Sequence, residues 1–357
     1  MAPLVSRLAA DPRFDAKVCV TGQHVEMLEQ VNTLFGIVPE HDLKIMRAGQ
    51  GLTHITTAVL EGMEEVLRAE QPDYVLVHGD TTTSMAAALA AFYAGVKVGH
   101  VEAGLRTQNL LSPWPEEANR QLTGRLTNLH FAPTELSRKN LLAENVSDDH
   151  IHVTGNTVID ALLSITHKFE EDAGFSAEQQ KLFPFLDESK RLILVTGHRR
   201  ENHDGGIARV CRALAELAKR GDVQVVYPVH LNPKVAGVVA EELAGVDNVT
   251  LIDPLPYLPF VWMLGKASII VTDSGGIQEE APSLGKPVLV TRDTTERPEA
   301  VDAGTVRLVG TDPEALVTET MALLDNADSY AAMAQAHNPY GDGHASERIV
   351  EILAAQG

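Results

Sequence analysis

Two carboxylate residues in the first half of the chain follow apolar runs that are typical of buried strands, and a third lies at the start of a helical pattern. Asp80 comes after Tyr74–His78, Glu102 after Lys97–His100, and Glu116 opens a helical pattern further on. In parallel sheets the carboxyl ends of the strands meet at one edge, where ligands bind. Carboxylates facing one ligand there can remove a proton from one side and deliver a proton to the other. The pattern favours acid–base chemistry, although Asp80 also fits a helix cap and Glu116 a complement to the helix dipole.

The second half carries a glycine turn, Ser274-Gly275-Gly276, between an apolar strand pattern and a short helical pattern. Paired glycines at a helix N-terminus let an anion approach free backbone N–H groups, and the helix dipole favours its charge. Glu280 can accept hydrogen bonds from sugar hydroxyls, and Arg297 can bind a diphosphate. The turn alone also fits an ordinary strand–helix–strand crossover. With Glu280 and Arg297 added, it indicates a nucleotide-sugar site.

A cationic segment, Gly197-His198-Arg199-Arg200-Glu201, follows the first strand pattern of this half. His198 and Arg199 suit a diphosphate, because arginine forms bidentate hydrogen bonds with phosphate oxygens. A lone loop histidine is more often solvated surface, and here the neighbouring arginines favour a binding role. His230 fits a turn residue and a regulatory contact equally well.

These residues need sheets to position them, and two series of short apolar runs predict the strands. In the first half we expect strands near Lys17–Thr21, Leu43–Met46, Tyr74–His78, Lys97–His100, His130–Ala132 and His152–Thr154. In the second half we expect them near Leu192–Thr196, Val223–Val229, Val249–Ile252, Ser268–Thr272, Pro287–Val290 and Thr305–Val309. Amphipathic helices are expected between them, including Leu52–Glu70 and Thr82–Tyr93. Continuous apolar runs are typical of parallel strands covered on both faces, so the sequence predicts an α/β protein with two doubly wound domains, divided near Gly155.

Composition narrows the class of partner. The 357 residues include 29 basic and 49 acidic side chains, which gives a formal charge of -20 and argues against a nucleic-acid or anionic-membrane surface. The two cysteines, Cys19 and Cys211, each lie in an apolar segment, so we expect a reduced cytoplasmic setting without disulfides. The sequence shows no signal peptide and no apolar run long enough to span a bilayer.

Several common catalytic motifs are absent from the sequence. It has no G-x-G-x-x-G fingerprint, no P-loop, no H-E-x-x-H and no G-x-S-x-G elbow. The absence of these motifs argues against nicotinamide, ATP, zinc and serine-hydrolase chemistry, and we predict neither a metal nor a cofactor.

The start of the chain departs from a doubly wound half. Met1 is followed at once by a helical pattern in which Leu4, Leu8 and Ala9 fall on one face. Such a half normally begins with a central strand and a ligand-binding turn before that helix. We expect the first strand of this domain to be absent from the chain as given.

The motifs occur together in an order that resembles a known family. They are His78-Gly79-Asp80-Thr81-Thr82, His100-Val101-Glu102-Ala103-Gly104-Leu105-Arg106, Pro115-Glu116-Glu117-Ala118-Asn119-Arg120, Thr196-Gly197-His198-Arg199-Arg200-Glu201-Asn202 and Thr272-Asp273-Ser274-Gly275-Gly276-Ile277-Gln278-Glu279-Glu280. The chain resembles the non-hydrolysing UDP-N-acetylglucosamine 2-epimerases, bacterial enzymes of the GT-B fold, from Met1 to its last helical pattern. Each motif alone is weak, and the ordered set is highly specific.

The resemblance implies a reaction and a set of roles. UDP-N-acetylglucosamine and UDP-N-acetylmannosamine would interconvert through elimination of UDP to a 2-acetamidoglucal and re-addition, supplying units for cell-surface polysaccharide. The implied acid–base and UDP-side catalytic residues are Asp80, Glu102, Glu116 and His198, and the implied UDP-binding residues are Arg199, Phe260, Ser274, Gly275, Gly276, Glu280 and Arg297. The resemblance implies a homodimer, and it implies neither a metal nor a nicotinamide cofactor.

The GT-B resemblance also implies how the chain is divided. Residues 1–155 would form an N-terminal Rossmann-like domain and residues 156–344 the UDP-binding domain, with the active-site cleft between them. A last helix near 345–357 would pack back on the first domain. Family members carry a further strand and a Gly-Thr-Arg-Pro-Glu turn before the segment equivalent to Met1, and we interpret Met1 as a misassigned start.

Some members of this family also bind a second UDP-N-acetylglucosamine as an activator. Gln23, His24, Gln50, Arg199 and His230 align with positions used there. The match is incomplete, because Val25 and Gly49 replace arginines of other members, so allosteric activation is a hypothesis.

Three other functions remain open. A GT-B glycosyltransferase would use the same glycine turn but needs an acceptor groove. A hydrolysing relative would release free N-acetylmannosamine and UDP. A catalytically inactive UDP-sugar-binding protein is a third alternative, because of the start of the chain.

Overall fold

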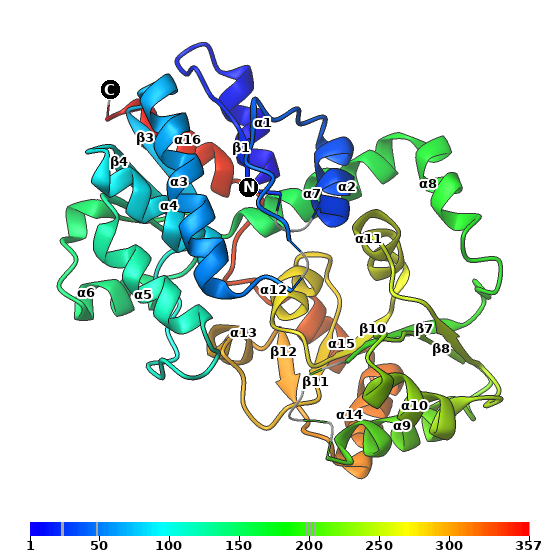
Figure 1. Cartoon of the computed structure of the whole chain (residues 1–357). Helices are drawn as coiled ribbons and strands as arrows, with labels where there is room; N and C mark the ends of the chain where they lie inside the picture. The colour runs from blue at the N-terminus through cyan, green and yellow to red at the C-terminus, as the bar shows by residue number, and fades with distance from the viewer. Residues whose placement is uncertain (23–24, 48, 198, 200–201, 203, 357) are drawn as a thin grey trace. The chain divides into compact units, whose positions relative to one another are not determined.

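The computed structural model describes residues 1–22, 25–47, 49–197, 199, 202 and 204–356. The chain forms two compact units, and it crosses between them twice (Figure 1). Unit 1 comprises Met1–Ala161 and Tyr340–Gly357, and unit 2 comprises Leu162–Pro339. Helix α7, Thr157–Glu171, contains the first crossing. No helix among the described residues is long and apolar enough to cross a membrane.

Unit 1 is built on parallel strands in two sheets. A four-stranded sheet has the order β3-β4-β5-β6, and a two-stranded sheet pairs β1 with β2. The strands are β1 Cys19–Val20, β2 His41–Asp42, β3 Tyr74–His78, β4 Lys97–Val101, β5 Leu129–Ala132 and β6 Ile151–Val153. The helices are α1 Ala2–Ala10, α2 Val25–Phe35, α3 Leu52–Glu70, α4 Thr82–Tyr93, α5 Glu116–Leu126, α6 Glu135–Ala143 and α16 Ala345–Ala354, with a short 3-10 helix at Asp148–His150.

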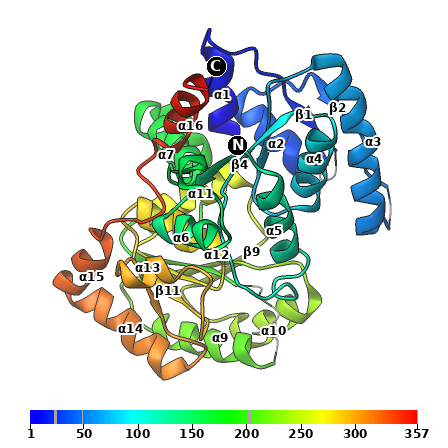
Figure 2. The ribbon, with the colours of Figure 1, turned by 90° about the vertical axis from the view of Figure 1, so that its left-hand side faces the viewer.

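Helices cover both faces of the larger sheet in unit 1. Helices α3 and α4 pack together on one core, into which α3 projects Ile55, Val59 and Met63 at helical spacing (Figure 2). The two terminal helices, α1 and α16, lie side by side over another core (Figures 1 and 2). Leu4 and Leu8 of α1 are buried there as the sequence predicts, whereas Ala9 is exposed and does not belong to that face.

Unit 2 is a doubly wound unit with a single parallel sheet. Its six strands have the order β12-β11-β10-β7-β8-β9. They are β7 Arg191–Thr196, β8 Val223–Pro228, β9 Val249–Ile252, β10 Ile269–Thr272, β11 Val288–Val290 and β12 Val306–Leu308. Its helices are α8 Ala173–Gln180, α9 Gly206–Leu217, α10 Pro233–Leu243, α11 Tyr257–Lys266, α12 Gly275–Ser283, α13 Pro298–Asp302, α14 Pro313–Asp325 and α15 Ala327–Ala334.

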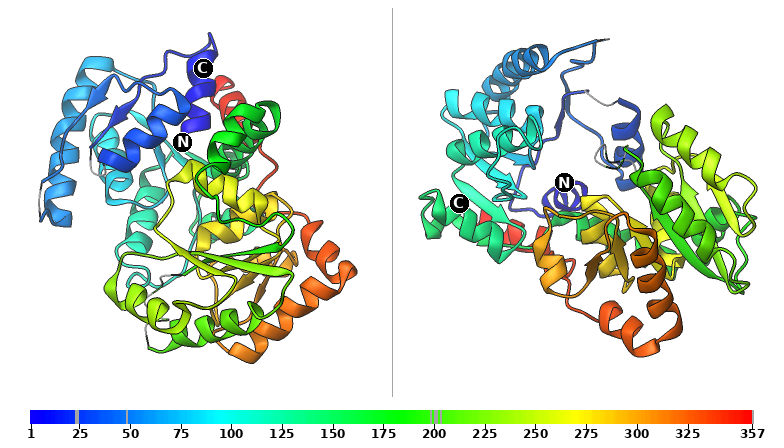
Figure 3. Two further views of the ribbon diagram at one scale, coloured as in Figure 1. Left: turned by 90° about the vertical axis from the view of Figure 1, so that its right-hand side faces the viewer. Right: turned by 90° about the horizontal axis from the view of Figure 1, so that it is seen from below.

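The strand order of unit 2 reverses between β7 and β10, and this reversal locates its ligand site. Helices α9, α10 and α14 pack against one face of the sheet, and α11 and α12 lie on the opposite face (Figures 1 and 3). The strands are buried almost throughout, which explains their continuous apolar sequences. In open α/β sheets, ligands bind beyond the carboxyl ends of the strands at such a reversal.

The predicted strands agree with the structure within a few residues, with one exception. Leu43–Met46 is not a strand; β2 instead forms at His41–Asp42, where it pairs with β1. The polar stretch after α7 contains helix α8.

Candidate active site

Asp80 and Glu102 lie in neighbouring turns of unit 1, just after β3 and β4. Glu102 has a φ of 63° and Gly79 a φ of 65°, so both turns are sharp. An ideal Cβ atom on Gly79 would lie 3.2 Å from Glu102 Oε2, which shows how closely the Glu102 carboxylate approaches the Asp80 turn. Glu102 is also 3.5 Å from His78 Nε2 and accepts from Asn156 Nδ2 at 3.5 Å.

Asp80 is not a helix cap. Thr81 is the N-cap of α4, and its side chain accepts from Ser84 N. The Asp80 carboxylate instead forms an ion pair with Arg120, while Asn119 Nδ2 donates to the Asp80 carbonyl at 3.0 Å. Asp80 is therefore held by side chains of α5.

The helix that holds Asp80 also carries Glu116. Glu116 is the first residue of α5 and half-buried, and Arg120 follows one helical turn later. Arg120 is in turn 3.4 Å from Glu117, whose carboxylate is fully buried and accepts from the backbone N–H of Thr107 at 3.0 Å. One buried chain of charges thus links the loop before α5 to Asp80.

In unit 2, Asp273 joins the loops that follow β7 and β10. Its carboxylate is buried and accepts from Arg199 N at 2.9 Å and from Asn202 Nδ2 at 3.2 Å. These two strands flank the reversal of strand order. Asp273 therefore fixes Arg199 at the edge of the sheet where a ligand is expected.

Helix α12 begins in this same place. Ser274 is its N-cap without a side-chain cap bond, and Gly275 and Gly276 are its first residues. The first N–H groups of a helix have no partner within it, so this end suits an anion. An ideal Cβ on Gly275 would lie 3.3 Å from Glu296 Oε1 and 3.7 Å from Arg199 Nη2, so the missing side chain is what lets these groups approach.

The cations around α12 are held by carboxylates. Arg199 Nη2 donates to Glu296 Oε1 at 2.9 Å, and Arg297 forms an ion pair with buried Glu279. Burial alone would raise the pKa of Glu296, but Arg292 and Arg199, with hydrogen bonds, lower it to about 2. Glu296 is therefore anionic at neutral pH.

Glu280 is another buried carboxyl group of this region. Burial raises its pKa to about 7, and the nearby Glu279 adds to the shift. Tyr257 Oη donates to Glu280 Oε1 at 3.3 Å. Phe260 is half-buried on the same helix as Tyr257.

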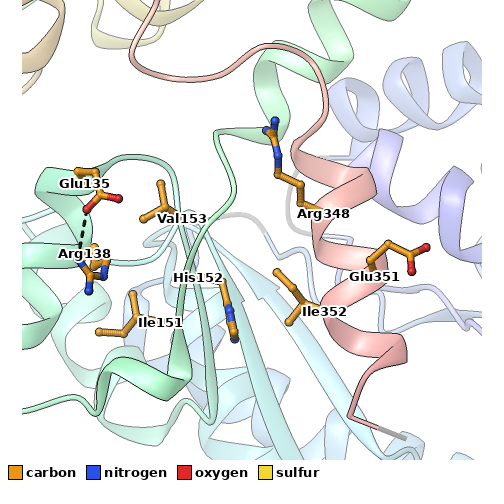
Figure 4. Close-up of a pocket in the computed structure, with 8 residues that line it drawn as sticks. All are labelled: Glu135, Arg138, Ile151, His152, Val153, Arg348, Glu351 and Ile352. Carbon is orange, nitrogen blue, oxygen red and sulfur yellow. Dashed lines mark hydrogen bonds and ion pairs between the residues drawn. The ribbon is translucent and has the colours of Figure 1, made fainter.

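A shallow hollow beside β6 and α16 involves none of the predicted site residues. Its lining is Glu135, Arg138, Ile151, His152, Val153, Arg348, Glu351 and Ile352 (Figure 4). The two arginines there are already paired, Arg138 with Asp148 and Arg348 with Asp342. We do not assign this hollow to the active site.

Comparison with known proteins identifies the family. A model of the family described as UDP-N-acetylglucosamine 2-epimerase matches residues 6–354. The chain belongs to this family. It is 61% identical over 354 residues to the UDP-N-acetylglucosamine 2-epimerase of Escherichia coli K12, a match that covers 99% of this chain and 94% of that protein.

Solved structures of epimerases have the same fold. The Neisseria meningitidis UDP-GlcNAc 2-epimerase, bound to UDP-GlcNAc, has a TM-score of 0.91 at 51% identity, covering 99% of this chain and 96% of that one. The Methanocaldococcus jannaschii enzyme, in complex with UDP-GlcNAc and UDP, has a TM-score of 0.80 at 32% identity, covering 100% and 96%. A Rickettsia africae glycosyltransferase, with a TM-score of 0.57 at 15% identity over 91% of this chain and 86% of that one, shares the fold alone. The chain is thus an epimerase-family α/β protein with two GT-B-like, Rossmann-like bodies.

Not all of the predicted residues lie in the part of the chain that the structure describes. His198, Gln23 and His24 lie outside the described residues. Gln50 belongs to unit 1, where its Oε1 accepts from Arg47 N at 3.0 Å, and His230 belongs to unit 2. His230 Nδ1 accepts from Asn232 N at 3.1 Å, a contact that fits a turn residue.

The sequence did not assign roles to several residues that hold the candidate site residues in place. Asp273 and Arg120 lie inside the quoted motifs, and Glu296 directly precedes Arg297, but each has a partner that is distant in sequence. The one local signal is the spacing of Arg120 from Glu116, which places both on the same face of a helix.

Proposed function

We propose that this epimerase-family chain interconverts UDP-N-acetylglucosamine and UDP-N-acetylmannosamine. The observation that carries the proposal is the family match over residues 6–354, joined to the close approach of the Asp80 and Glu102 turns. One carboxylate removes the C2 proton as the C1–oxygen bond breaks, so UDP leaves with the bonding electrons and a C1=C2 double bond forms. Protonation of C2 from the other face, with attack of the UDP oxygen on C1, gives the epimer.

Unit 1 supplies the acid–base residues in this proposal. Asp80, Glu102 and Glu116 are the proton carriers, and Arg120 orients Asp80. Proton transfer by a positioned side chain contributes about 100- to 10,000-fold to a rate. A replacement of any of the three carboxylates by its amide should cost a comparable factor in kcat.

Unit 2 holds UDP in this proposal. The start of α12 at Ser274, Gly275 and Gly276 takes the diphosphate, with Arg199, Arg297 and His198 as its cations. Glu280 accepts hydrogen bonds from the ribose hydroxyls, and Phe260 lies by the uracil. UDP must stay bound between elimination and re-addition, because the glucal cannot return to a UDP-sugar once UDP is lost to solvent.

The deciding experiment is proton NMR of UDP-N-acetylglucosamine with the protein in D2O. We expect the C2 proton to exchange for deuterium and both epimers to appear, with no acceptor added. A transferase would exchange nothing, a hydrolysing relative would accumulate free N-acetylmannosamine and UDP, and an inactive protein would bind UDP without reaction.

We also propose that the protein is a homodimer and that a second UDP-N-acetylglucosamine activates it. Sedimentation analysis tests the first statement, and a monomer at micromolar concentration contradicts it. For the second, we expect a lag when the reaction starts from pure UDP-N-acetylmannosamine. Hyperbolic kinetics without a lag would rule out the activator.

A further inference from the structure

The Glu296 carboxylate lies over the N-terminus of α12, where the diphosphate is proposed to bind. The nearest atom to an ideal Cβ on Gly275 is Glu296 Oε1, at 3.3 Å, followed by Arg199 Nη2 at 3.7 Å. Gly275 is the first residue of α12, and anions bind at such helix ends. A side-chain carboxylate of the protein itself thus occupies a position suited to a phosphate oxygen.

The two oxygens of Glu296 have different partners. Oε1 accepts from Arg199 Nη2 at 2.9 Å, and Oε2 accepts from Arg292 Nη1 at 2.6 Å. Arg292 is buried, with 8% of its surface exposed, and lies four residues from Glu296 on the same loop. The Arg199 side chain is 36% exposed. Arg292 is therefore the fixed anchor of Glu296, and Arg199 is the partner that can exchange.

We propose that Glu296 is an internal competitor for the diphosphate of UDP. Without UDP, Glu296 neutralises Arg199 and covers the start of α12. When UDP binds, its phosphate replaces Glu296 as the partner of Arg199, and Glu296 retains its ion pair with Arg292. The exchange lowers the affinity for UDP, so the finished UDP-sugar can leave while Arg199 is never left unpaired. This inference rests on the proposed function.

Glu296→Gln tests the proposal, because it removes the competing charge and keeps an oxygen that can accept from Arg292. We expect the Kd for UDP, measured by calorimetry, to fall about fivefold, the effect of one partly exposed ion pair. The Kd for uridine, which has no phosphate, should not change. Asp293→Asn is the matched control, since it removes the same charge from an exposed position of the same loop and should leave both constants unchanged.

Unchanged or weaker UDP binding by Glu296→Gln overturns the proposal, as does equal tightening in Asp293→Asn. A structure of the wild-type enzyme with UDP tests it without any substitution. We expect Arg199 Nη2 at about 3 Å from a phosphate oxygen and no longer bonded to Glu296; an intact Arg199–Glu296 pair in that complex refutes it. Failure of wild-type protein to bind UDP or to epimerise would instead contradict the proposed function.

Discussion

At the scale of single residues, Asp80 depends on a partner that is 40 positions away in the sequence. Arg120 is buried between Asp80 and Glu117, so its guanidinium has little freedom to move. Asp80 is thereby held in one orientation at the end of β3. Orientation matters for proton transfer, because small displacements of a catalytic group cost large factors in rate.

We expect Arg120→Met to lower kcat about 100-fold while the Kd for UDP stays unchanged, because UDP binding is assigned to unit 2. Arg120→Lys should recover part of the loss, since it keeps a charge but not the planar fork. Arg125→Met, on the same helix at a more exposed position, should retain activity. The role fails if Arg120→Met keeps full kcat or loses UDP binding in parallel.

Glu280 makes the stability of unit 2 fall as pH rises from acid to neutral. Because its pKa in the folded state, about 7, lies above the ordinary 4.5, the folded protein binds a proton that the unfolded chain releases. Stability from this group is present below pH 4.5 and is lost as pH rises through 7, a total of about 3 kcal/mol.

Glu280→Gln should therefore remove this pH-dependent loss of unfolding free energy between pH 4.5 and 8. Trp262 is buried in unit 2 and is one of two tryptophans, so its fluorescence in a Trp114→Phe background reports this unit. Glu241→Gln, at an exposed position of unit 2, is the control. Equal pH slopes in wild type and Glu280→Gln would contradict the assignment.

At the scale of elements, β4 and β5 bury two histidines opposite one another. His100 pairs in register with His130, and each is 1% exposed. His100 Nε2 donates to the Gly79 carbonyl at 2.7 Å. Burial lowers the pKa of His100 to about 4 and that of His130 to about 3.

Acid should weaken these strands. Both folded-state values lie below the ordinary 6.5, so the stability is complete above pH 6.5 and falls as the unfolded chain takes up protons toward pH 4. We expect hydrogen exchange in β4 and β5 to show a loss of about 2 kcal/mol per imidazole at pH 5. His130→Gln should remove one imidazole's share of the loss, about 2 kcal/mol at pH 5, and exposed His344→Gln should not; an unchanged slope in His130→Gln would refute this account.

The turn after β4 depends on a glycine that touches helix α6. Gly104 has a φ of 91°, and an ideal Cβ there would lie 2.4 Å from the Ser137 carbonyl oxygen. Gly104→Ala should lower the unfolding free energy of unit 1 by about 3 kcal/mol, from strain and collision together. Gly51→Ala, with open space and no positive φ, should change it by less than about 1 kcal/mol. Equal losses of unfolding free energy in Gly104→Ala and Gly51→Ala, measured by denaturation, would contradict the predicted collision.

The elements that the sequence predicted are those with a strong local pattern. Leu52–Glu70 and Tyr74–His78 have the expected bounds because helical spacing and a continuous apolar run are visible locally. Strand β2 was predicted wrongly because its two polar residues, His41 and Asp42, become a strand only by pairing with β1. For the same reason the sequence indicated Asp80 as a candidate but not the contact with Arg120.

At the scale of the whole molecule, the C-terminal segment completes unit 1. Ile349, Val350 and Leu353 of α16 are buried against α1, and the backbone N–H groups of Ala345 and Ser346 donate to Asp160. Unit 2 has its own core, formed from residues between the two crossings.

Deletion of residues 340–357 should therefore destabilise unit 1 selectively. We expect amide protection in β4 and β5 to collapse while that of β7 and β10 is retained, measured by hydrogen exchange with mass spectrometry. Glu351→Gln, which only weakens an exposed ion pair of α16 with Arg13, should leave both units protected. A parallel loss of protection in unit 2 would show that the two cores are not independent.

The double crossing also sets an order of events during synthesis. The segment that forms unit 2 leaves the ribosome as one continuous stretch, whereas unit 1 must wait for α16, which is translated after that segment. Domains generally fold as units while the chain emerges, so unit 2 can finish first. Until α16 is translated, Leu4 and Leu8 of α1 lack their α16 neighbours, and the nascent chain carries an open apolar surface that chaperones can bind.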